Sequence, residues 1–102
     1  MRFIHRGVLG LTMLLIPAGA GAQTPAPPRL VLVCAPCHGF DGVGHDRTIP
    51  NLAGQHRDYL VGQLTAFRSG QRIHPTMNFF SGQMTREELQ GIVEYYSALP
   101  RP

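Results

Sequence analysis

The segment Cys34-Ala35-Pro36-Cys37-His38 contains the residue types and spacing that point most directly to chemistry. On a helical turn, positions i, i+3 and i+4 share one face, so Cys34, Cys37 and His38 are expected to point the same way. Two thiols at this spacing can add across the two vinyl groups of a haem, and the adjacent histidine can then ligate the iron from one side. The C-x-x-C-H pattern therefore predicts covalent attachment of one c-type haem.

Three other readings of the same residues are weaker. A thioredoxin-type redox disulfide requires a preceding strand in a βαβ pattern, and the chain shows no parallel-sheet pattern. A structural zinc site needs four ligands, whereas the chain has two cysteines, and the adjacent Cys37 and His38 are awkward co-ligands. An inert disulfide between Cys34 and Cys37 closes only a very small loop. Haem attachment is the favoured interpretation.

Haem iron has a sixth position, which a side chain can fill or leave open. Met77 follows Pro75 in a stretch that we predict to be irregular, where the backbone can aim a side chain at the iron. Met84 directly precedes the predicted helix N-cap Thr85, a position at which an apolar residue packs against the helix that follows. Met77 is therefore favoured over Met84 as the distal ligand.

Histidines are the other candidates for that position. His45 lies in a glycine-containing loop and His56 at a helix start, and both are expected to be solvent-exposed. His74 lies three residues from Met77 and is the main histidine alternative. An open sixth site, as in a ligand-sensing haem protein, also remains an alternative at this stage.

The N-terminal segment, residues 1–22, is predicted to be a secretory signal peptide. Arg2 and Arg6 form a positive start, residues 7–16 form an apolar run too short to span a bilayer, and Ala20-Gly21-Ala22 is a small-residue cleavage site. The mature domain is then expected to be residues 23–102, with an uncertainty of two residues because Ala18-Gly19-Ala20 also fits. We expect no membrane span after cleavage and a periplasmic, soluble product.

Helical patterns dominate the remainder of the chain. After Arg29, Leu and Val alternate over residues 30–33 with no polar residue between them, so residues 29–33 fit a helix or a strand. The haem motif favours a helix, which is expected to bend or end at the cysteines because of Pro36. Residues 56–69 place Leu60, Leu64 and Phe67 on one helical face, and Gly70 follows as the C-cap glycine.

A further helix is predicted at the C-terminal end. The segment Thr85-Arg86-Glu87-Glu88 has the form of a capping box, and the helix that it begins should run to about Leu99. Residues 71–84 are predicted to be irregular, and no strand pattern of any length is present. The fold class is therefore small and all-α.

The charge of the chain excludes one class of partner. The chain has nine Arg and no Lys, and removal of Arg2 and Arg6 leaves seven Arg against six carboxylates, a net charge of +1. Two haem propionates bring this to −1. Nucleic-acid binding needs a clustered basic face, which this composition does not supply.

Four segments resemble the small class I cytochromes c of bacteria, most of all the single-haem modules of their diheme relatives. In order they are CAPCHGFDGVG, IPNLAGQHRDYLVGQLTAFRSGQR, HPTMNFFSGQMTREEL and VEYYSALP. The resemblance implies three to four helices around one covalently bound haem. It implies thioether links at Cys34 and Cys37, His38 as proximal ligand, Met77 as distal ligand, and a hydrogen bond from the His38 ring to the Pro50 carbonyl.

The same resemblance implies crossing terminal helices, with residues 30–33 against Tyr95 or Tyr96. It also implies an electron carrier rather than an enzyme, because two filled axial positions favour single-electron cycling of the iron. Expected partners are transient redox proteins, such as a quinol-oxidising complex, a terminal oxidase or a periplasmic dehydrogenase. A haem subunit of such a dehydrogenase is the main alternative. In the absence of Lys, docking is expected to use Arg47, Arg57, Arg68 and Arg72, or to be mainly apolar.

Overall fold

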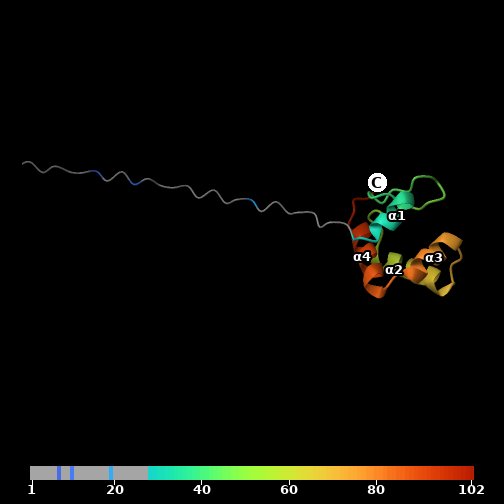
Figure 1. The fold of residues 1–102 in the computed structure, drawn as a ribbon. Helices are drawn as coiled ribbons and strands as arrows, with labels where there is room; N and C mark the ends of the chain where they lie inside the picture. The colour runs from blue at the N-terminus through green and yellow to red at the C-terminus, as the bar shows by residue number, and fades with distance from the viewer. Residues whose placement is uncertain (1–6, 8–9, 11–18, 20–27) are drawn as a thin grey trace, which may run out of the picture.

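Four α-helices make up the described part of this computed structural model, which covers residues 28–102 and the isolated glycines 7, 10 and 19 (Figure 1). They are α1 (Val31–His38), α2 (Arg57–Ser69), α3 (Pro75–Gln83) and α4 (Arg86–Ser97). Over residues 28–102 no strand is present, as the sequence predicts. The predicted signal peptide and its cleavage site lie outside the described residues, apart from the three glycines.

The haem motif lies on α1, which settles the ambiguity between helix and strand in favour of the helix. Its first turn begins where the Val31 N–H donates to the Pro28 carbonyl at 2.8 Å. Pro36 was expected to bend or end the helix at the cysteines. It does not end the helix, because α1 continues through Cys37 to His38. Pro36 removes only one intrahelical donor, and the helix stops at Gly39, whose φ of 78° is open to glycine.

The second helix ends at Ser69 with Gly70 as its C-cap, as predicted, and begins at Arg57, one residue after the predicted start at His56, which is its N-cap. Leu60 and Phe67 are buried, and Leu64 packs against the core as a partly buried residue. Gly70 takes the left-handed conformation at φ 80°, and its N–H donates to the Phe67 carbonyl.

The third helix corrects the prediction that residues 71–84 are irregular, because Pro75–Gln83 is helical. Two local features begin it. Pro75 occupies the first turn, where its missing N–H costs nothing, and the His74 side chain accepts a hydrogen bond from the Met77 N–H. Met77 therefore projects from the first turn of a helix rather than from an irregular loop.

The fourth helix begins with the predicted capping box. The Thr85 hydroxyl accepts from the Glu88 N–H at 3.1 Å, and the Glu88 carboxylate accepts from the Thr85 N–H at 2.8 Å. The helix ends at Ser97, two residues before the predicted Leu99. Its apolar stripe is buried as expected: Leu89, Ile92, Val93 and Tyr96.

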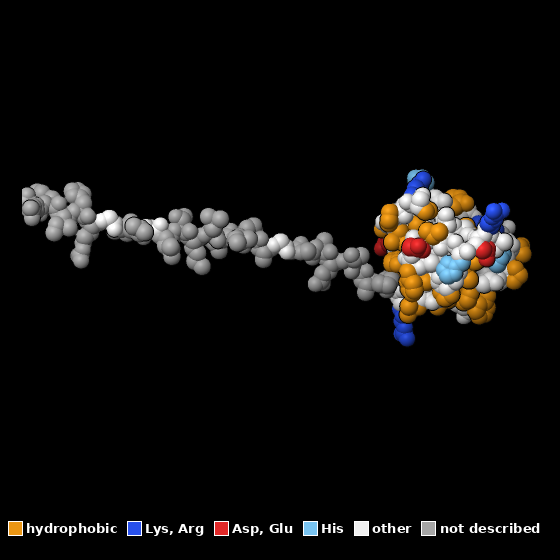
Figure 2. Space-filling model, turned by 90° about the horizontal axis from the view of Figure 1, so that it is seen from above, with side chains coloured by type: hydrophobic (Ala, Val, Ile, Leu, Met, Phe, Trp, Pro, Cys, Tyr) orange, Lys and Arg blue, Asp and Glu red, His pale blue; other side chains and the backbone are white. Residues whose placement is uncertain are grey.

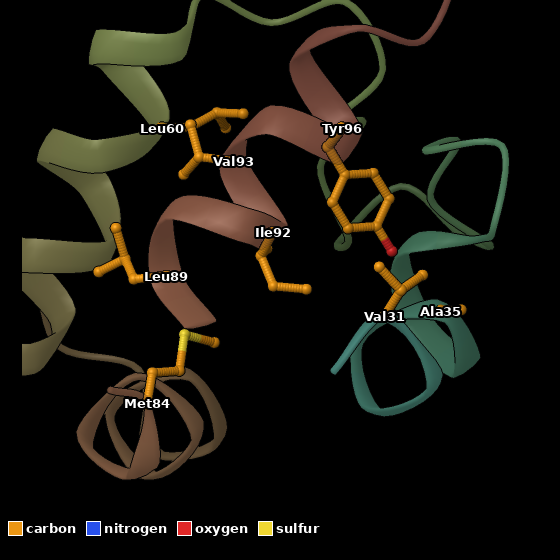
Figure 3. Close-up of a cluster of buried hydrophobic side chains, with 8 residues drawn as sticks. All are labelled: Val31, Ala35, Leu60, Met84, Leu89, Ile92, Val93 and Tyr96. Atoms are coloured by element: carbon orange, nitrogen blue, oxygen red, sulfur yellow. The ribbon is translucent and has the colours of Figure 1, made fainter. Parts of the chain in front are cut away.

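The core lies around α4, which passes between α1 and α2 (Figure 3). Val31 and Ala35 of α1 pack on one side of it, beneath Tyr96, and Leu60 of α2 packs on the other. Leu30 and Tyr95 are partly buried against the same cluster. The expected packing of residues 30–33 against the last helix is therefore present, with Val31 and Tyr96 in one core cluster.

Candidate haem-binding site

A cavity of about 480 Å³ brings the predicted site residues together. Cys34, Cys37 and His38 of α1 line it, as do Pro50 and Met77. Much of the remaining wall is apolar, and includes Leu52, Leu60, Leu64, Phe67, Phe80, Ile92 and Val93. An apolar cavity with a few convergent polar groups suits a large planar ligand such as haem.

His38 is held in one orientation by a hydrogen bond to the loop that follows. The side chain is buried, with 8% of its surface exposed, and Nδ1 lies 2.9 Å from the Pro50 carbonyl oxygen. A carbonyl oxygen only accepts, so Nδ1 carries the proton and Nε2 keeps its lone pair for a metal. The structure thus contains the contact that the resemblance implies, and it is the contact that orients a metal-bound imidazole.

The loop that carries Pro50 is fixed by bonds at several points. The Gly42 carbonyl accepts from the N–H groups of Leu52 and Ala53, at 2.7 and 3.1 Å. Asp46 accepts from the Thr48 hydroxyl and N–H, at 2.6 and 2.7 Å, and these bonds lower the pKa of the Asp46 carboxyl. A rigid loop keeps the acceptor for His38 in place.

The two cysteines differ in exposure. Cys34 is partly buried and Cys37 is exposed, and both are free thiols. Burial raises the pKa of the Cys34 thiol to about 11, so this sulfur is protonated at neutral pH before haem attachment. Two thioether bonds to one haem require two thiols on the same cavity wall, and Cys34 and Cys37 both line this cavity. In the described part of the chain, no group of three or more His, Cys, Asp or Glu is arranged to hold a metal ion.

Both candidate methionines line the cavity, and their surroundings distinguish them. Met77 is partly exposed and projects from the first turn of α3. Met84 is 4% exposed and belongs to the core cluster together with Leu89, the pairing expected of a residue that packs on the helix it precedes. Figure 3 shows Met84 below the N-terminal end of α4, near Leu89 and Ile92.

The three histidine candidates for the sixth position occupy different places. His45 and His56 are exposed and do not line the cavity. His74 lines the cavity but is exposed, and its Nδ1 lies 3.4 Å from the Met77 backbone nitrogen, from which it accepts a hydrogen bond. That bond uses one ring nitrogen of His74 to cap the N-terminus of α3, the helix that carries Met77.

Asn78 is a structural residue of the site that the sequence analysis missed. Its Nδ2 donates to the carbonyls of Phe67 and Arg72, at 2.7 and 2.9 Å, and its Oδ1 accepts from the His74 N–H at 2.8 Å. One side chain thus fastens the end of α2, the connection and the start of α3, beside Met77. The only signal in the sequence was its position after Met77, because the acceptors lie six and eleven residues away.

The arginines expected to dock partners have separate roles in the structure. Arg47 is exposed, and Arg57 pairs with Glu94 at 3.3 Å. Arg68 donates to the Met84 carbonyl at 2.6 Å, and the Arg72 guanidinium lies over the Phe67 ring. Of these four arginines, Arg72 alone lines the cavity.

Comparison with known proteins places this chain in a family. Residues 29–99 match the cytochrome c family model, and the chain belongs to the cytochrome c family. The covalent c-type haem predicted from Cys34-x-x-Cys37-His38 is therefore the cofactor of this chain, and this motif occurs once in the sequence. The resemblance to class I cytochromes c and the all-α fold are confirmed.

Two relatives and one solved structure show the range of similar proteins. The chain is 33% identical to a thiosulfate dehydrogenase electron acceptor of Stutzerimonas stutzeri, over all of this chain and 51% of that protein. It is 30% identical to the cytochrome subunit of sulfide dehydrogenase of Chlorobaculum tepidum, over 92% of this chain and 97% of that protein. The structure of Acidithiobacillus ferrooxidans cytochrome c4 matches with a TM-score of 0.61 and 38% identity, over 65% of this chain and 38% of that one.

The chain spans about half or less of the length of the first relatives that it matches. Within the part of the chain that the structure describes, no helix has both the length and the apolar character needed to cross a membrane.

Proposed function

We propose that this chain carries single electrons through a c-type haem attached at Cys34 and Cys37 and ligated by His38 and Met77. The observation that carries the proposal is that residues of two helices line the same cavity. Helix α1 supplies both cysteines and the buried His38, which a hydrogen bond orients, and α3 supplies Met77. When bound, such a haem supplies reversible one-electron chemistry at its iron. Histidine and methionine together raise the reduction potential, because a soft thioether favours the ferrous state.

The residues around the cavity serve this role by orienting the ligand His38 and by excluding water, and not by catalysing a reaction. Pro50 fixes the imidazole of His38, and the apolar wall excludes water and favours the less charged ferrous state. We therefore propose a carrier, not an enzyme. We propose export to the periplasm through residues 1–22, and transient redox partners that dock through small interfaces.

A second candidate role is a haem subunit inside a dehydrogenase complex. It is favoured by the names of two relatives, an electron acceptor of thiosulfate dehydrogenase and a cytochrome subunit of sulfide dehydrogenase. In that case the same haem relays electrons from a catalytic chain to which this chain stays bound. Stable co-purification with a larger catalytic chain from the native host supports this role, and purification of this chain alone supports the free carrier.

The proposed ligands can be tested with a pair of leucine variants. Met77→Leu and Met84→Leu each remove a sulfur and keep an apolar side chain of similar volume, so that neither opens a large hole. The proteins are produced with c-haem maturation machinery, and the absorption spectrum of the ferric form is recorded. The weak far-red band of a methionine–iron(III) bond should be present in the parent protein, absent from Met77→Leu and retained in Met84→Leu.

Three results contradict the proposal. The absence of covalently bound haem from the parent protein overturns the whole assignment. Loss of the band in Met84→Leu with retention in Met77→Leu transfers the ligand role to Met84. Rapid binding of carbon monoxide to the reduced parent protein at neutral pH counts against a filled sixth position and in favour of a ligand-sensing protein.

A further inference from the structure

A second side chain able to ligate iron lies beside Met77. His74 lines the same cavity, and among the described lining residues the only other histidine is His38 on α1. Ferric iron, the harder of the two oxidation states, favours an imidazole nitrogen over a soft thioether. Because His74 is only three residues from Met77, the chain needs a structural reason for the thioether to stay bound when the iron is oxidised.

The hydrogen bond of the His74 ring fixes a tautomer that is unsuited to binding iron. Its Nδ1 accepts from the Met77 N–H at 3.4 Å, so the proton of the neutral ring is on Nε2. His38 has the opposite arrangement, because its Nδ1 donates to the Pro50 carbonyl at 2.9 Å and its Nε2 is free. While His74 caps α3, one of its ring nitrogens is used in a hydrogen bond and the other holds a proton.

The position of His74 depends more on its backbone than on this ring contact. The bond from the Met77 N–H is long, whereas two shorter bonds join His74 to Asn78. The Asn78 N–H donates to the His74 carbonyl at 2.8 Å, and the Asn78 Oδ1 accepts from the His74 N–H at 2.8 Å. Asn78 therefore holds the residue that caps α3 from both sides of its backbone.

The side chain of Asn78 also fastens the start of α3 to α2. Its Nδ2 donates to the carbonyls of Phe67 and Arg72, at 2.7 and 2.9 Å. Carbonyl oxygens only accept, so these bonds and the bond from the His74 N–H are satisfied together by one orientation of the amide. Phe67 is buried in α2, which makes it a firm anchor. At 1.5 Å per residue, His74 lies about 4.5 Å from Met77 along α3, and bringing its imidazole to the place of the sulfur is expected to move the anchored segment.

We propose that Asn78 determines which residue is the distal ligand, by holding the start of α3 so that Met77 reaches the iron and His74 stays in its cap. Asn78 is a positioning residue, because it acts through the segment that carries both possible ligands. The inference rests on the proposed function, since it takes Met77 as the ligand of a bound haem. Release of this segment exchanges a thioether for an imidazole when the iron is ferric.

The main test is a variant of nearly the same shape as the parent. Asn78→Asp keeps an oxygen for the His74 N–H, but it replaces two N–H donors with an acceptor that faces two carbonyls. In the ferric, haem-loaded variant the far-red methionine band should be lost, and electron paramagnetic resonance should show low-spin iron with two imidazole ligands. The reduction potential should fall, with a shift of about tenfold or more toward the ferric form, because methionine ligation raises the potential.

Two further variants separate the choice of ligand from a loss of stability. His74→Asn removes the imidazole and keeps a favourable N-cap, so the two-imidazole signal should be absent from Asn78→Asp/His74→Asn. Thr85→Ala removes a cap of α4 at a residue that does not line the cavity, and it should keep the far-red band and the potential of the parent. Guanidinium unfolding of each variant gives the loss of stability against which the spectra are compared.

The proposal is overturned if Asn78→Asp keeps the parent spectrum and potential, or if it becomes high-spin without a second imidazole. Persistence of the two-imidazole signal in Asn78→Asp/His74→Asn assigns the new ligand to another histidine and also overturns it. The same signal in Thr85→Ala attributes the exchange to general destabilisation, with the same consequence.

Loss of haem from the main variant is also decisive. If Asn78→Asp matures without haem, Asn78→Ser takes its place, because serine removes the amide without adding a charge. Failure of both variants to mature overturns the proposal in favour of a folding role. A parent protein without covalent haem, or without the far-red band, is a different result, because it contradicts the proposed function before Asn78 is reached.

Discussion

Tyr95 and Tyr96 are neighbours on α4 that make the same kind of hydrogen bond in different surroundings. The Tyr96 hydroxyl donates to the Gly39 carbonyl at 3.0 Å and its side chain is fully buried. The Tyr95 hydroxyl donates to the Phe40 carbonyl at 2.7 Å at a partly exposed position. Both bonds tie the last helix to the residues that directly follow the haem motif.

The two tyrosines should therefore respond differently to phenylalanine. In Tyr96→Phe the buried Gly39 carbonyl keeps only the 3.3 Å bond from the Gly42 N–H, and the free energy of unfolding should fall by about 1–2 kcal/mol. In Tyr95→Phe water can replace the hydroxyl, so the loss should be below about 1 kcal/mol. Guanidinium unfolding of the haem-loaded proteins measures both, and equal losses would contradict the argument.

Burial also gives Tyr96 a signature at alkaline pH. Burial is the main cause that raises the pKa of Tyr96, while an unfolded chain releases the phenolic proton at about pH 10. Above that pH the unfolded state binds fewer protons than the folded state, so stability should fall as pH rises. The slope should be shallower in Tyr96→Phe and preserved in Tyr95→Phe.

Sequence reasoning at this scale succeeds where the signal is local and fails where it is not. Cys34, Cys37 and His38 share a cavity wall because they are adjacent on one helix. Asn78 and Tyr96 make bonds whose acceptors lie 11 and 57 residues away, and nothing in their neighbours indicates those acceptors. The bond from His38 to Pro50, 12 residues away, was expected only because the segment resembles a known family.

At the scale of elements, the loop between α1 and α2 depends on a close approach of two backbone segments. Gly42 has a φ of 74°, and a Cβ placed on it would lie 2.7 to 2.9 Å from atoms of Ala53. Gly70 has a similar φ of 80° at the end of α2, but a Cβ there would meet nothing within 4 Å. The two glycines share a conformation and differ in their surroundings.

Alanine at these glycines should separate conformational strain from steric contact. Gly70→Ala should lower the free energy of unfolding by about 1–2 kcal/mol, the cost of a left-handed residue with a Cβ. Gly42→Ala should cost distinctly more, because the backbone at Ala53 must also move, and it should reduce the fraction of protein that matures with haem. Denaturant unfolding and the haem-to-protein absorbance ratio are the measurements; a loss in Gly42→Ala no larger than in Gly70→Ala would contradict the steric argument.

The elements that were predicted well carry strong terminal signals. The capping box of Thr85 and Glu88 and the glycine at position 70 mark their helices in the sequence as clearly as in the structure. The missed helix α3 has weaker signals, since its N-cap is a histidine and Gly82 interrupts its pattern. Asn78 fastens this helix to α2 through contacts that lie outside the local pattern.

At the scale of the whole molecule, charge is sparse and dispersed. On the face shown in Figure 2 the arginine side chains lie apart from one another and do not gather into one basic patch. Three of the exposed residues that line the cavity are apolar or aromatic: Val33, Tyr59 and Ile73, which are 42%, 52% and 76% exposed. These exposed residues favour the alternative that docking relies on contact area more than on arginines.

Electron exchange between two copies of this protein should consequently depend little on salt. Residues 23–102 carry a net charge of +1, and two propionates bring it to −1, so long-range repulsion between copies is small. The self-exchange rate, measured by NMR line broadening in mixtures of the oxidised and reduced forms, should change by less than about tenfold between low and high ionic strength. Strongly charged partners show steering effects of about 10–10³-fold, which salt screens.

A charge placed among these exposed cavity-lining residues provides the control for this prediction. Val33→Glu adds a carboxylate at an exposed residue that lines the cavity, so two copies that approach through their haem edges bring like charges together. Its self-exchange should be slower than the parent's at low salt and should rise as salt screens the repulsion. If the parent itself shows a steep salt dependence, the docking face is charged; if Val33→Glu behaves like the parent, electrons leave the haem through another face of the molecule.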